Sequence, residues 1–365
     1  MTRTPPLLAT RRAICLGLAG TASGLGARQA PAEEGWTTLV AGRRAVRLRP
    51  DAGQAADLWT FGESAPGPTV RVRAGAPLRL RFENRTDRPL SFHVYGLRGP
   101  NPLDGVGGLT GAPTPPGGSG TLEMASPPPG TYLIRPIVPG GSAEPAERGL
   151  SALLVIEERR PPAVDREVEL LVDDWRLAPD GALAPFGDVV EAATLGRLGN
   201  WLTAGGEPLP RRIEAAPGAR LRLRLANASN ARVMPIRFEG LKAYVAAIDS
   251  VPTDTFEPLR ATLPFPPGRR YDLIVEVPET GTGTLLAAIG PGVPIAVVAA
   301  TGAKAGGAPG APAGIAERPS LPPEIRLQNA ARRDLALGGG ARRTPEGARY
   351  DGDPARIWTV NGTAG

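Results

Sequence analysis

The sequence predicts an all-β protein built from two tandem β-sandwich domains. Its 48 glycines and 42 prolines indicate short strands joined by many tight turns, not long helices. From about Gly35 onward, apolar and polar residues alternate in short runs, which on a pleated strand puts one face inward and one outward. A length of 365 residues with 41% hydrophobic residues is enough for two packed cores.

The clearest alternation is VRVR at 70–73, followed after a turn by LRLRF at 78–82. On a sheet with one solvated face, the aliphatic positions are expected to face a core and the arginines water. A binding surface formed by these arginines is the alternative.

The same phrase returns 143 residues later as LRLRL, so that Leu78 aligns with Leu221 and Asn84 with Asn227. Each copy then continues through a further strand to a Gly-Leu pair. A repeat of this length, made of several short strands, indicates two homologous sandwich domains. We predict these domains at residues 31–160 and 161–301.

Two further segments follow the second predicted domain. Residues 302–350, rich in Ala, Gly and Pro, are expected to form a linker. Within residues 351–365, the run IWTVNG at 357–362 echoes NWLTAG at 200–205, which precedes the LRLRL run of the second copy. We therefore predict the first strand of a third domain that is otherwise absent from this chain.

Residues 1–30 are predicted to be an export signal and not part of the fold. A basic start with Arg3, Arg11 and Arg12 precedes a mildly apolar run at 13–27 that is too short and too rich in glycine to span a bilayer. Because Thr10-Arg11-Arg12 is similar to the twin-arginine motif, we expect export by that route to the periplasm or the cell exterior. The alternatives are an uncleaved anchor or a misassigned start codon.

Removal of this signal changes both the charge and the cysteine content. The formal net charge of +6 includes four arginines and no acid within residues 1–30, so cleavage after Ala30 would leave +2. Nucleic acid is therefore not expected as a partner, whereas an unknown protein partner stays open. Cys15, the only cysteine, would leave with the signal, so no mature disulfide or cysteine metal ligand is expected. We also expect no transmembrane segment in the mature chain.

His93, the only histidine, lies in the segment PLSFHVYGLRGPNPLDGVGGL at 89–109. Other short segments with little meaning alone accompany it: PGPT at 66–69, PPG at 115–117, VDDW at 172–175, GRLGNW at 196–201 and ASNAR at 228–232. In this order and spacing they resemble multicopper oxidases over most of residues 55–300. The resemblance implies that both sandwiches are cupredoxin-like Greek-key domains.

In the multicopper oxidase family, domain one supplies four histidines to a three-copper cluster, through a His-Trp-His-Gly signature and a later His-x-His. Carried over by position, His93 matches the first histidine, Tyr95 replaces the second, and Arg135 and Ile137 replace the later pair. Neither isoleucine nor arginine offers copper a lone pair, and arginine adds a fixed positive charge. The resemblance thus implies degenerate copper sites with His93 as a hydrogen-bonded remnant of a metal position, and no bound cofactor, although copper is the family's cofactor.

Three acidic positions have structural interpretations. Asp104 matches a proton-relay position of the family, but without a cluster an Asp-Gly turn is the preferred interpretation. Asp173 and Asp174 are adjacent, so on a strand they point to opposite faces, and a strand-end cap is favoured over an acid-base pair. No catalytic or cofactor-binding residue is nominated.

The function that the resemblance implies is an exported multicopper-oxidase-like protein that has lost its copper sites and acts as a non-catalytic binding or scaffold protein. It would be similar to copper-free family members that support cell division. The alternative is a copper-dependent oxidoreductase, present as a truncated chain or needing a partner domain. Activity of this chain alone is not expected, and tightly bound copper in the purified protein would contradict the first hypothesis.

Overall fold

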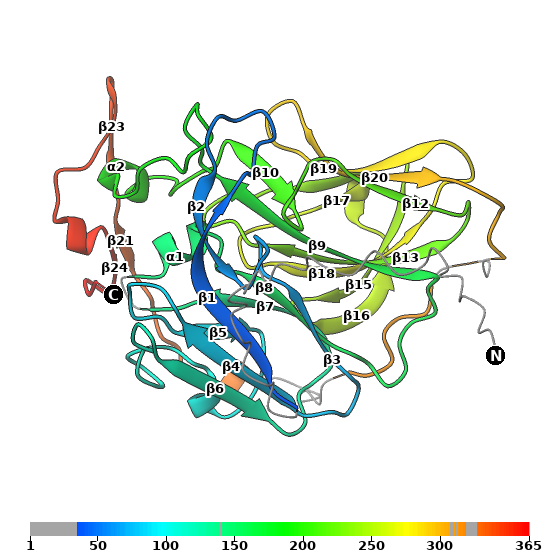
Figure 1. The fold of residues 1–365 in the computed structure, drawn as a ribbon, viewed down its shortest axis with the longest axis horizontal. Helices are drawn as coiled ribbons and strands as arrows, with labels where there is room; N and C mark the ends of the chain where they lie inside the picture. The colour runs from blue at the N-terminus through cyan, green and yellow to red at the C-terminus, as the bar shows by residue number, and fades with distance from the viewer. Residues whose placement is uncertain (1–34, 139–140, 307–309, 311, 319–326, 365) are drawn as a thin grey trace, which may run out of the picture. The chain divides into compact units, whose positions relative to one another are not determined.

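Two pairs of β-sheets make up most of the structure (Figure 1). The computed structural model describes residues 35–138, 141–306, 310, 312–318 and 327–364. Within these ranges the α-helices are short, α1 (Ala143–Glu147) and α2 (Val189–Ala192), so the prediction of an all-β fold is confirmed. The predicted export signal, with Arg3, Arg11, Arg12 and Cys15, lies outside the described residues.

The first sandwich spans residues 37–156. One sheet contains, in spatial order, β2 (Ala56–Phe61), β1 (Thr37–Val46), β4 (Leu78–Asn84) and β6 (Ser119–Met124). The other contains β3 (Thr69–Val72), β8 (Ala152–Ile156), β7 (Gly130–Pro136) and β5 (Phe92–Tyr95). Between them lies a buried core in which the rings of Phe82 and Phe92 stack with centroids 5.0 Å apart.

The second sandwich spans residues 166–300. Its larger sheet contains β11 (Glu207–Pro208), β10 (Trp201–Ala204), β9 (Arg166–Trp175), β13 (Arg220–Asn227), β18 (Arg270–Glu276), β15 (Lys242–Ile248) and β16 (Val251–Phe256). The smaller contains β12 (Arg211–Ala215), β20 (Val293–Ala300), β19 (Thr282–Ala287), β14 (Ile236–Glu239) and β17 (Thr262–Leu263). Leucines of β13 and β18 pack with Phe265 in its core. The exact domain boundaries stay predictions.

The repeated phrase folds into equivalent strands, since β4 pairs in parallel with β1 and β13 pairs in parallel with β9. The last residue of the phrase, Asn84 or Asn227, is buried in both copies. Its side-chain amide donates to two loop carbonyls, and its Oδ1 accepts from the backbone N–H and the hydroxyl of the residue two positions later. The repeat therefore preserves side-chain contacts as well as strand positions.

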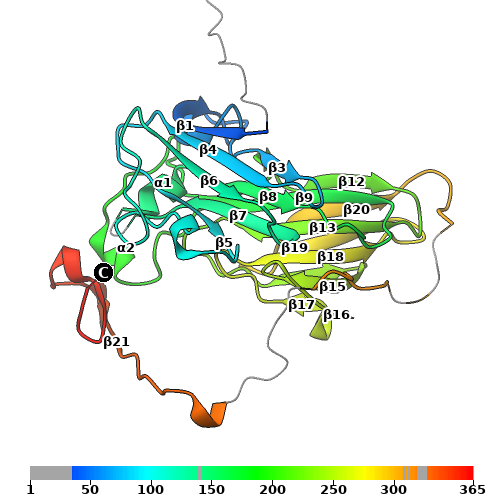
Figure 2. The ribbon, with the colours of Figure 1, turned by 90° about the horizontal axis from the view of Figure 1, so that it is seen from below.

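The predicted alternation holds in β4, where Leu78 and Leu80 are buried and the intervening arginine side chains are partly exposed. Arg71 of β3 departs from it, because this half-exposed side chain pairs with Glu167 and Glu169 of the second sandwich. The expectation of a purely solvated arginine face is therefore wrong at Arg71. Arg71 reaches these acids because the sheet β3-β8-β7-β5 lies against the seven-stranded sheet, as both ribbon views show (Figures 1 and 2).

The contact between the two sandwiches is partly apolar. Leu133 of β7 and Leu153 of β8 pack against Leu171 of β9 and Ala226 of β13. A second cluster surrounds Trp175, which is fully buried against residues of both sandwiches. The remaining contacts are polar and form the clusters described below.

Several segments complete the described chain. Strand β24 (Trp358–Val360) forms within the IWTVNG run and pairs with β21 (Leu337–Gly339), while β22 (Arg342–Thr344) pairs with β23 (Gly347–Arg349). The Trp358 indole donates to the carbonyl of Ala192 in α2. Within the predicted linker, Ile315 is buried against the outer face of the seven-stranded sheet. The linker and third-domain assignments stay predictions. The described residues also form the 3-10 helices η1 (Asn101–Leu103), η2 (Leu259–Ala261), η3 (Leu327–Asn329) and η4 (Pro354–Arg356).

Candidate functional site

His93 lies on β5, directly opposite Arg135 on the neighbouring strand β7. Its Nδ1 is 2.6 Å from the carbonyl oxygen of Asp104. Because a carbonyl oxygen can only accept, Nδ1 carries the proton in this contact. The edge of the ring meets Tyr95, with centroids 5.2 Å apart. His93 is therefore a half-buried histidine whose orientation is fixed by the loop that follows β5.

Arg135 does not turn toward His93. Its side chain crosses to the second sandwich, where Nη2 donates to Oδ1 of Asn230 at 2.7 Å and Nη1 donates to the carbonyl of Ser229 at 3.3 Å. The residue is only 6% exposed. Ile137, just beyond β7, is half-buried, and its backbone N–H donates to Ser91. The two positions at which the sequence resemblance places histidines thus hold a hydrogen-bonded guanidinium and an aliphatic side chain.

The chain bends at Asp104, just before Gly105. Asp104 caps η1 through its own N–H, and its carbonyl accepts from His93. Gly105 has φ +67°, and a Cβ there would come within 2.2 Å of the Phe92 carbonyl, so a larger residue does not fit. The hollow lined by His93, Asp104 and Met124 has no space for a water molecule. Among the described residues, no group of three or more His, Cys, Asp or Glu side chains could hold a metal ion.

Asp173 and Asp174, at the end of β9, are both buried. Asp174 accepts from the N–H of Gly199 and from Arg232, each at 2.7 Å, so it does cap the adjoining loop. Asp173 accepts from the N–H of Asp174 through one oxygen, whereas its Oδ2 has no hydrogen-bond partner in the described part of the chain. Burial and the charge of Asp174 raise the pKa of Asp173 well above its ordinary value, and Arg135 opposes that rise.

Glu147, at the end of α1, is a buried acid that the sequence did not suggest. Burial raises its pKa to about 7, although the nearby guanidinium of Arg197 favours the ionised form. The Glu147 carboxylate accepts from Arg197 Nε at 3.0 Å and from Asn230 Nδ2 at 3.4 Å. Asn230 therefore stands between Arg135 and Glu147, and the three side chains join the two sandwiches.

A cavity of about 550 Å³ lies beside this group, lined by residues that include Arg88, Phe186, Arg197, Asn230 and Ile357. Guanidinium carbons of Arg148 and Arg197 lie 4.8 and 4.2 Å from the centre of the Phe186 ring. Arg88 pairs with Glu144 at 2.8 Å, and Arg197 is hydrogen-bonded to Glu147. Because these charged groups already pair with one another, the cavity favours an apolar occupant.

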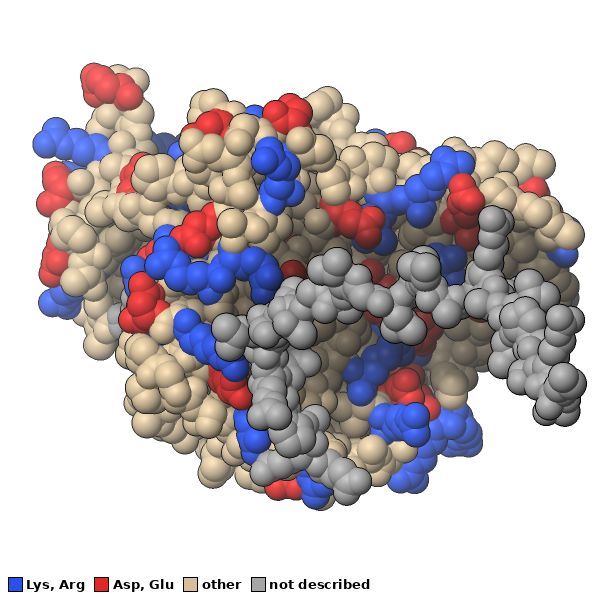
Figure 3. Space-filling model, viewed as in Figure 1, with Lys and Arg blue, Asp and Glu red and all other residues tan. Residues whose placement is uncertain are grey.

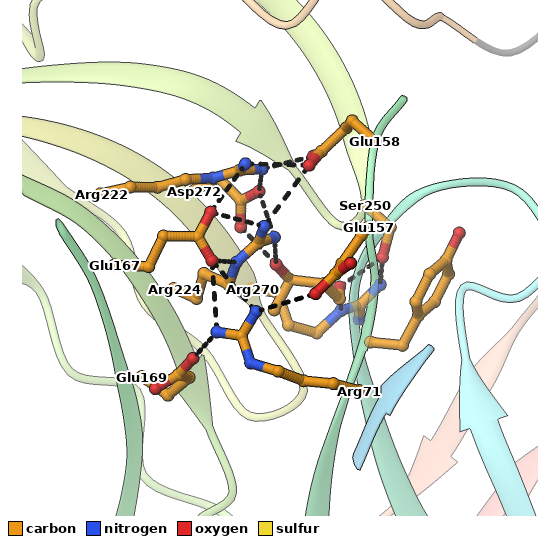
Figure 4. Close-up of polar contacts among 12 residues, drawn as sticks. Arg71, Glu157, Glu158, Glu167, Glu169, Arg222, Arg224, Ser250, Arg270 and Asp272 are labelled. Carbon is orange, nitrogen blue, oxygen red and sulfur yellow. Dashed lines mark hydrogen bonds and ion pairs between the residues drawn. The ribbon is translucent and has the colours of Figure 1, made fainter. Parts of the chain in front are cut away.

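The second polar contact between the sandwiches is a buried ionic network (Figure 4). Arg222 and Arg224 of β13 are 0% and 1% exposed as side chains. Arg222 donates through both Nη atoms to Glu158, which follows β8 of the first sandwich, and Arg224 donates through Nε and Nη2 to Glu167 of β9. Asp272 of β18 accepts from both arginines.

The alternation of arginines in β13 does not by itself predict that these arginines are buried. The sequence feature that could have predicted their partners is the run REVEL at 166–170, whose glutamates have the same two-residue spacing. Parallel pairing places Arg222 opposite Glu167 and Arg224 opposite Glu169. Complementary alternating charges on two strands thus predict that the strands are neighbours.

Two tandem β-sandwiches, each built from two packed sheets, are typical of the multidomain cupredoxin class. A family model described as multicopper oxidase matches residues 44–161. The crystal structure of a multi-copper oxidase from Pseudomonas thermotolerans is 31% identical, with a TM-score of 0.74, covering 83% of this chain and 71% of that one. The chain belongs to the multicopper oxidase family.

Named relatives fall into two groups. Cell division protein FtsP of Proteus mirabilis (strain HI4320) is 28% identical over 242 residues, which are 65% of this chain and 50% of that protein. Multicopper oxidase MmcO of Mycobacterium tuberculosis (strain ATCC 25618 / H37Rv) is 27% identical over 265 residues, 65% of this chain and 52% of that protein. The chain therefore spans about half the length of these relatives.

On the face shown in Figure 3, basic and acidic side chains are interspersed, and neither sign of charge dominates. No helix in the described ranges is long and apolar enough to cross a membrane.

Proposed function

We propose that this chain is a copper-free member of its family that binds or organises another protein, and that it is not an oxidase. The observation that carries this proposal is the chemistry around His93. Tyr95 makes a T-shaped ring contact with His93, and Arg135 donates hydrogen bonds to Ser229 and Asn230. The side chain of Ile137 has no lone pair with which to bind copper. Copper at such sites prefers several imidazole nitrogens in fixed geometry, and these side chains do not offer them.

Relatives named as cell division proteins support the non-catalytic hypothesis. The 550 Å³ cavity between α1 and α2 offers a place for an apolar side chain of a protein partner, since its polar groups are already paired. Nucleic acid is not proposed as a partner, because the charge expected after signal removal is small.

Copper analysis tests the proposal directly. The protein is produced in medium supplemented with copper, purified and dialysed against a weak chelator, and its metal is measured by mass spectrometry. We expect well under one copper per chain. One or more tightly bound copper ions per chain would contradict the proposal.

Export is part of the same proposal. We propose that residues 1–30 direct the chain to the periplasm or cell exterior through the twin-arginine route. Replacing Arg11 and Arg12 by lysine is expected to leave the full-length precursor in the cytoplasm, as cell fractionation would show. Replacing Arg3 by lysine is the matched control and should leave export intact. Export of the paired-lysine variant at the normal level would rule out the twin-arginine route.

The second candidate is a copper-dependent oxidoreductase that acts only with a further domain or a partner. Likeness to a multi-copper oxidase structure at 31% identity favours it. Oxygen consumption with a phenolic reductant, measured in copper-supplemented extracts of source cells with and without this chain, distinguishes the two, because such extracts contain any partner that the chain needs. A rate that falls when the chain is absent would favour the oxidoreductase, whereas equal rates are expected for the copper-free protein.

A further inference from the structure

The substituted copper position has acquired a new set of partners. Arg135 is almost fully buried at the end of β7 in the first sandwich, and both acceptors of its guanidinium belong to the loop after β13 in the second. Its cross-strand neighbour His93 is engaged elsewhere, with the Asp104 carbonyl. The guanidinium therefore links the two sandwiches directly.

The link continues beyond its first acceptor. Asn230 accepts from Arg135 through Oδ1, and its amide donates to the Ala143 carbonyl at 2.8 Å and to Glu147 at 3.4 Å. Glu147 in turn accepts from Arg197 Nε. One chain of contacts thus runs from β7 through the β13–β14 loop to α1 and the loop after α2.

Buried acids lie close to this chain of contacts. Asp173 is 3% exposed, lies next to Asp174, and has one carboxylate oxygen without a partner among the described residues. Glu147, also buried, adds a third carboxyl group to the same region. Buried acids of this kind are costly when ionised unless a positive charge compensates them, and the charge of Arg135 favours the ionised form of Asp173 by lowering its pKa.

We propose that Arg135 is a positioning residue that clamps the second sandwich to the first, acting as a permanent internal cation at a position where the family resemblance implies a metal ligand. Arginine suits this role because its charge is fixed and its planar fork can satisfy two acceptors at once. Histidine is too short to reach both acceptors and loses its charge near neutral pH. The inference goes beyond the proposed function, because it concerns how the chain is held together and not what it binds.

The test measures hydrogen exchange in the full-length protein, at residues 228–234 of the second sandwich. Arg135→Met keeps the aliphatic stem and removes the charge and donors. We expect exchange in this loop to rise by about tenfold or more, as loss of a charged hydrogen bond implies. Arg135→Lys retains the charge and should restore part of the protection. Arg79→Met, on the half-exposed face of β4, is the matched control and should leave the loop unchanged.

A second variant keeps the inference open to refutation if Arg135→Met does not fold. Asn230→Ala removes the main acceptor and leaves the cation near Asp173, so it should raise exchange in the same loop by a smaller factor. Unchanged exchange at 228–234 in both Arg135→Met and Asn230→Ala would overturn the proposal, as would equal loss of protection in Arg135→Met and Arg135→Lys. Copper analysis of the unmodified chain is a separate measurement, so the copper-free proposal can fail without affecting this one.

Discussion

Strands β4 and β13 carry nearly the same sequence and have different surroundings. In β4, LRLRF buries its aliphatic residues and leaves Arg79 half-exposed beside Glu123 of β6. In β13, LRLRL buries its leucines in one core and its arginines in an ionic network on the opposite face. The difference lies outside the strand, because the outer face of β13 is covered by the first sandwich.

The comparison shows that an alternating pattern determines which face enters the core but not what lies on the other face. Glu158 comes from the first sandwich, and Glu167 and Asp272 come from neighbouring strands, so all three partners of Arg222 are distant in sequence. Within a strand of about seven residues, the sequence pattern of a solvated face is the same as that of a face buried between two domains. The distinction can be tested by making the same substitution in both strands.

The largest effect is expected from Arg222→Met. The change leaves Glu158 and Asp272 buried with fewer positive partners, and breaking a buried ion pair costs about 3 to 5 kcal/mol. Urea unfolding at neutral pH measures the loss. A change below about 1 kcal/mol would show that the methionine is accommodated as well as the charge network, so that the network adds no stability.

The second largest effect is a dependence of stability on pH, with one loss of stability as the pH falls and another as the pH rises toward 7. Burial favours the protonated form of Asp272, but the charges of Arg222 and Arg224 outweigh the effect of burial and lower the pKa of Asp272 in the folded state. The ionised Asp272 therefore stabilises the fold at pH values above its pKa in the unfolded chain, and this stabilisation is lost as the pH falls through the folded-state pKa. Burial raises the pKa of Glu147 to about 7, so the folded state holds a proton that the unfolded state releases at lower pH. Stability therefore falls as pH rises from about 4.5 to 7.

Thermal unfolding followed from pH 3 to 8 checks both effects, and the highest melting temperature is expected in mildly acidic solution. Glu147→Gln should remove only part of the loss of stability toward neutral pH, because Asp173 also contributes to that loss. The substitution should leave the loss of stability at acidic pH unchanged. A variant that still lost as much stability between pH 5 and pH 7 as the unmodified chain would refute the role given to Glu147.

The fold could be predicted from the sequence because its signals are local. Alternation, turn residues and the LRLR run with its terminal asparagine can each be recognised within a few residues, and they appear in the structure as strands, turns and equivalent asparagines. The solvated arginine face expected from the alternation is wrong at Arg71, because its partners come from the second sandwich. The contacts of Arg135 could not be predicted in this way. Ser229 and Asn230 are its partners only because β7 and the β13–β14 loop meet across the two sandwiches. The same holds for Glu147, whose hydrogen-bond partners Arg197 and Asn230 are distant in sequence.

A smaller and matched effect is expected at the asparagines that end the repeated phrase. Asn84→Ala and Asn227→Ala each remove an amide that donates to two carbonyls and an oxygen that accepts two further hydrogen bonds. Leaving such buried groups unpaired costs about 2 to 3 kcal/mol. Chemical denaturation should give similar losses for the two variants. A loss confined to one copy would mean that the repeat preserves geometry without preserving energetics.

The smallest effect is expected from Arg79→Met, the counterpart in β4 of Arg222→Met. Arg79 pairs with Glu123 at 2.7 Å, but their side chains are 37% and 52% exposed, so water solvates both charges. Exposed ion pairs of this kind contribute about 0 to 1 kcal/mol. Added salt should remove even that difference, whereas the loss in Arg222→Met should persist, because a buried pair is screened far less. If both variants lost equal stability and responded equally to salt, the contrast between the two strands would not be one of burial.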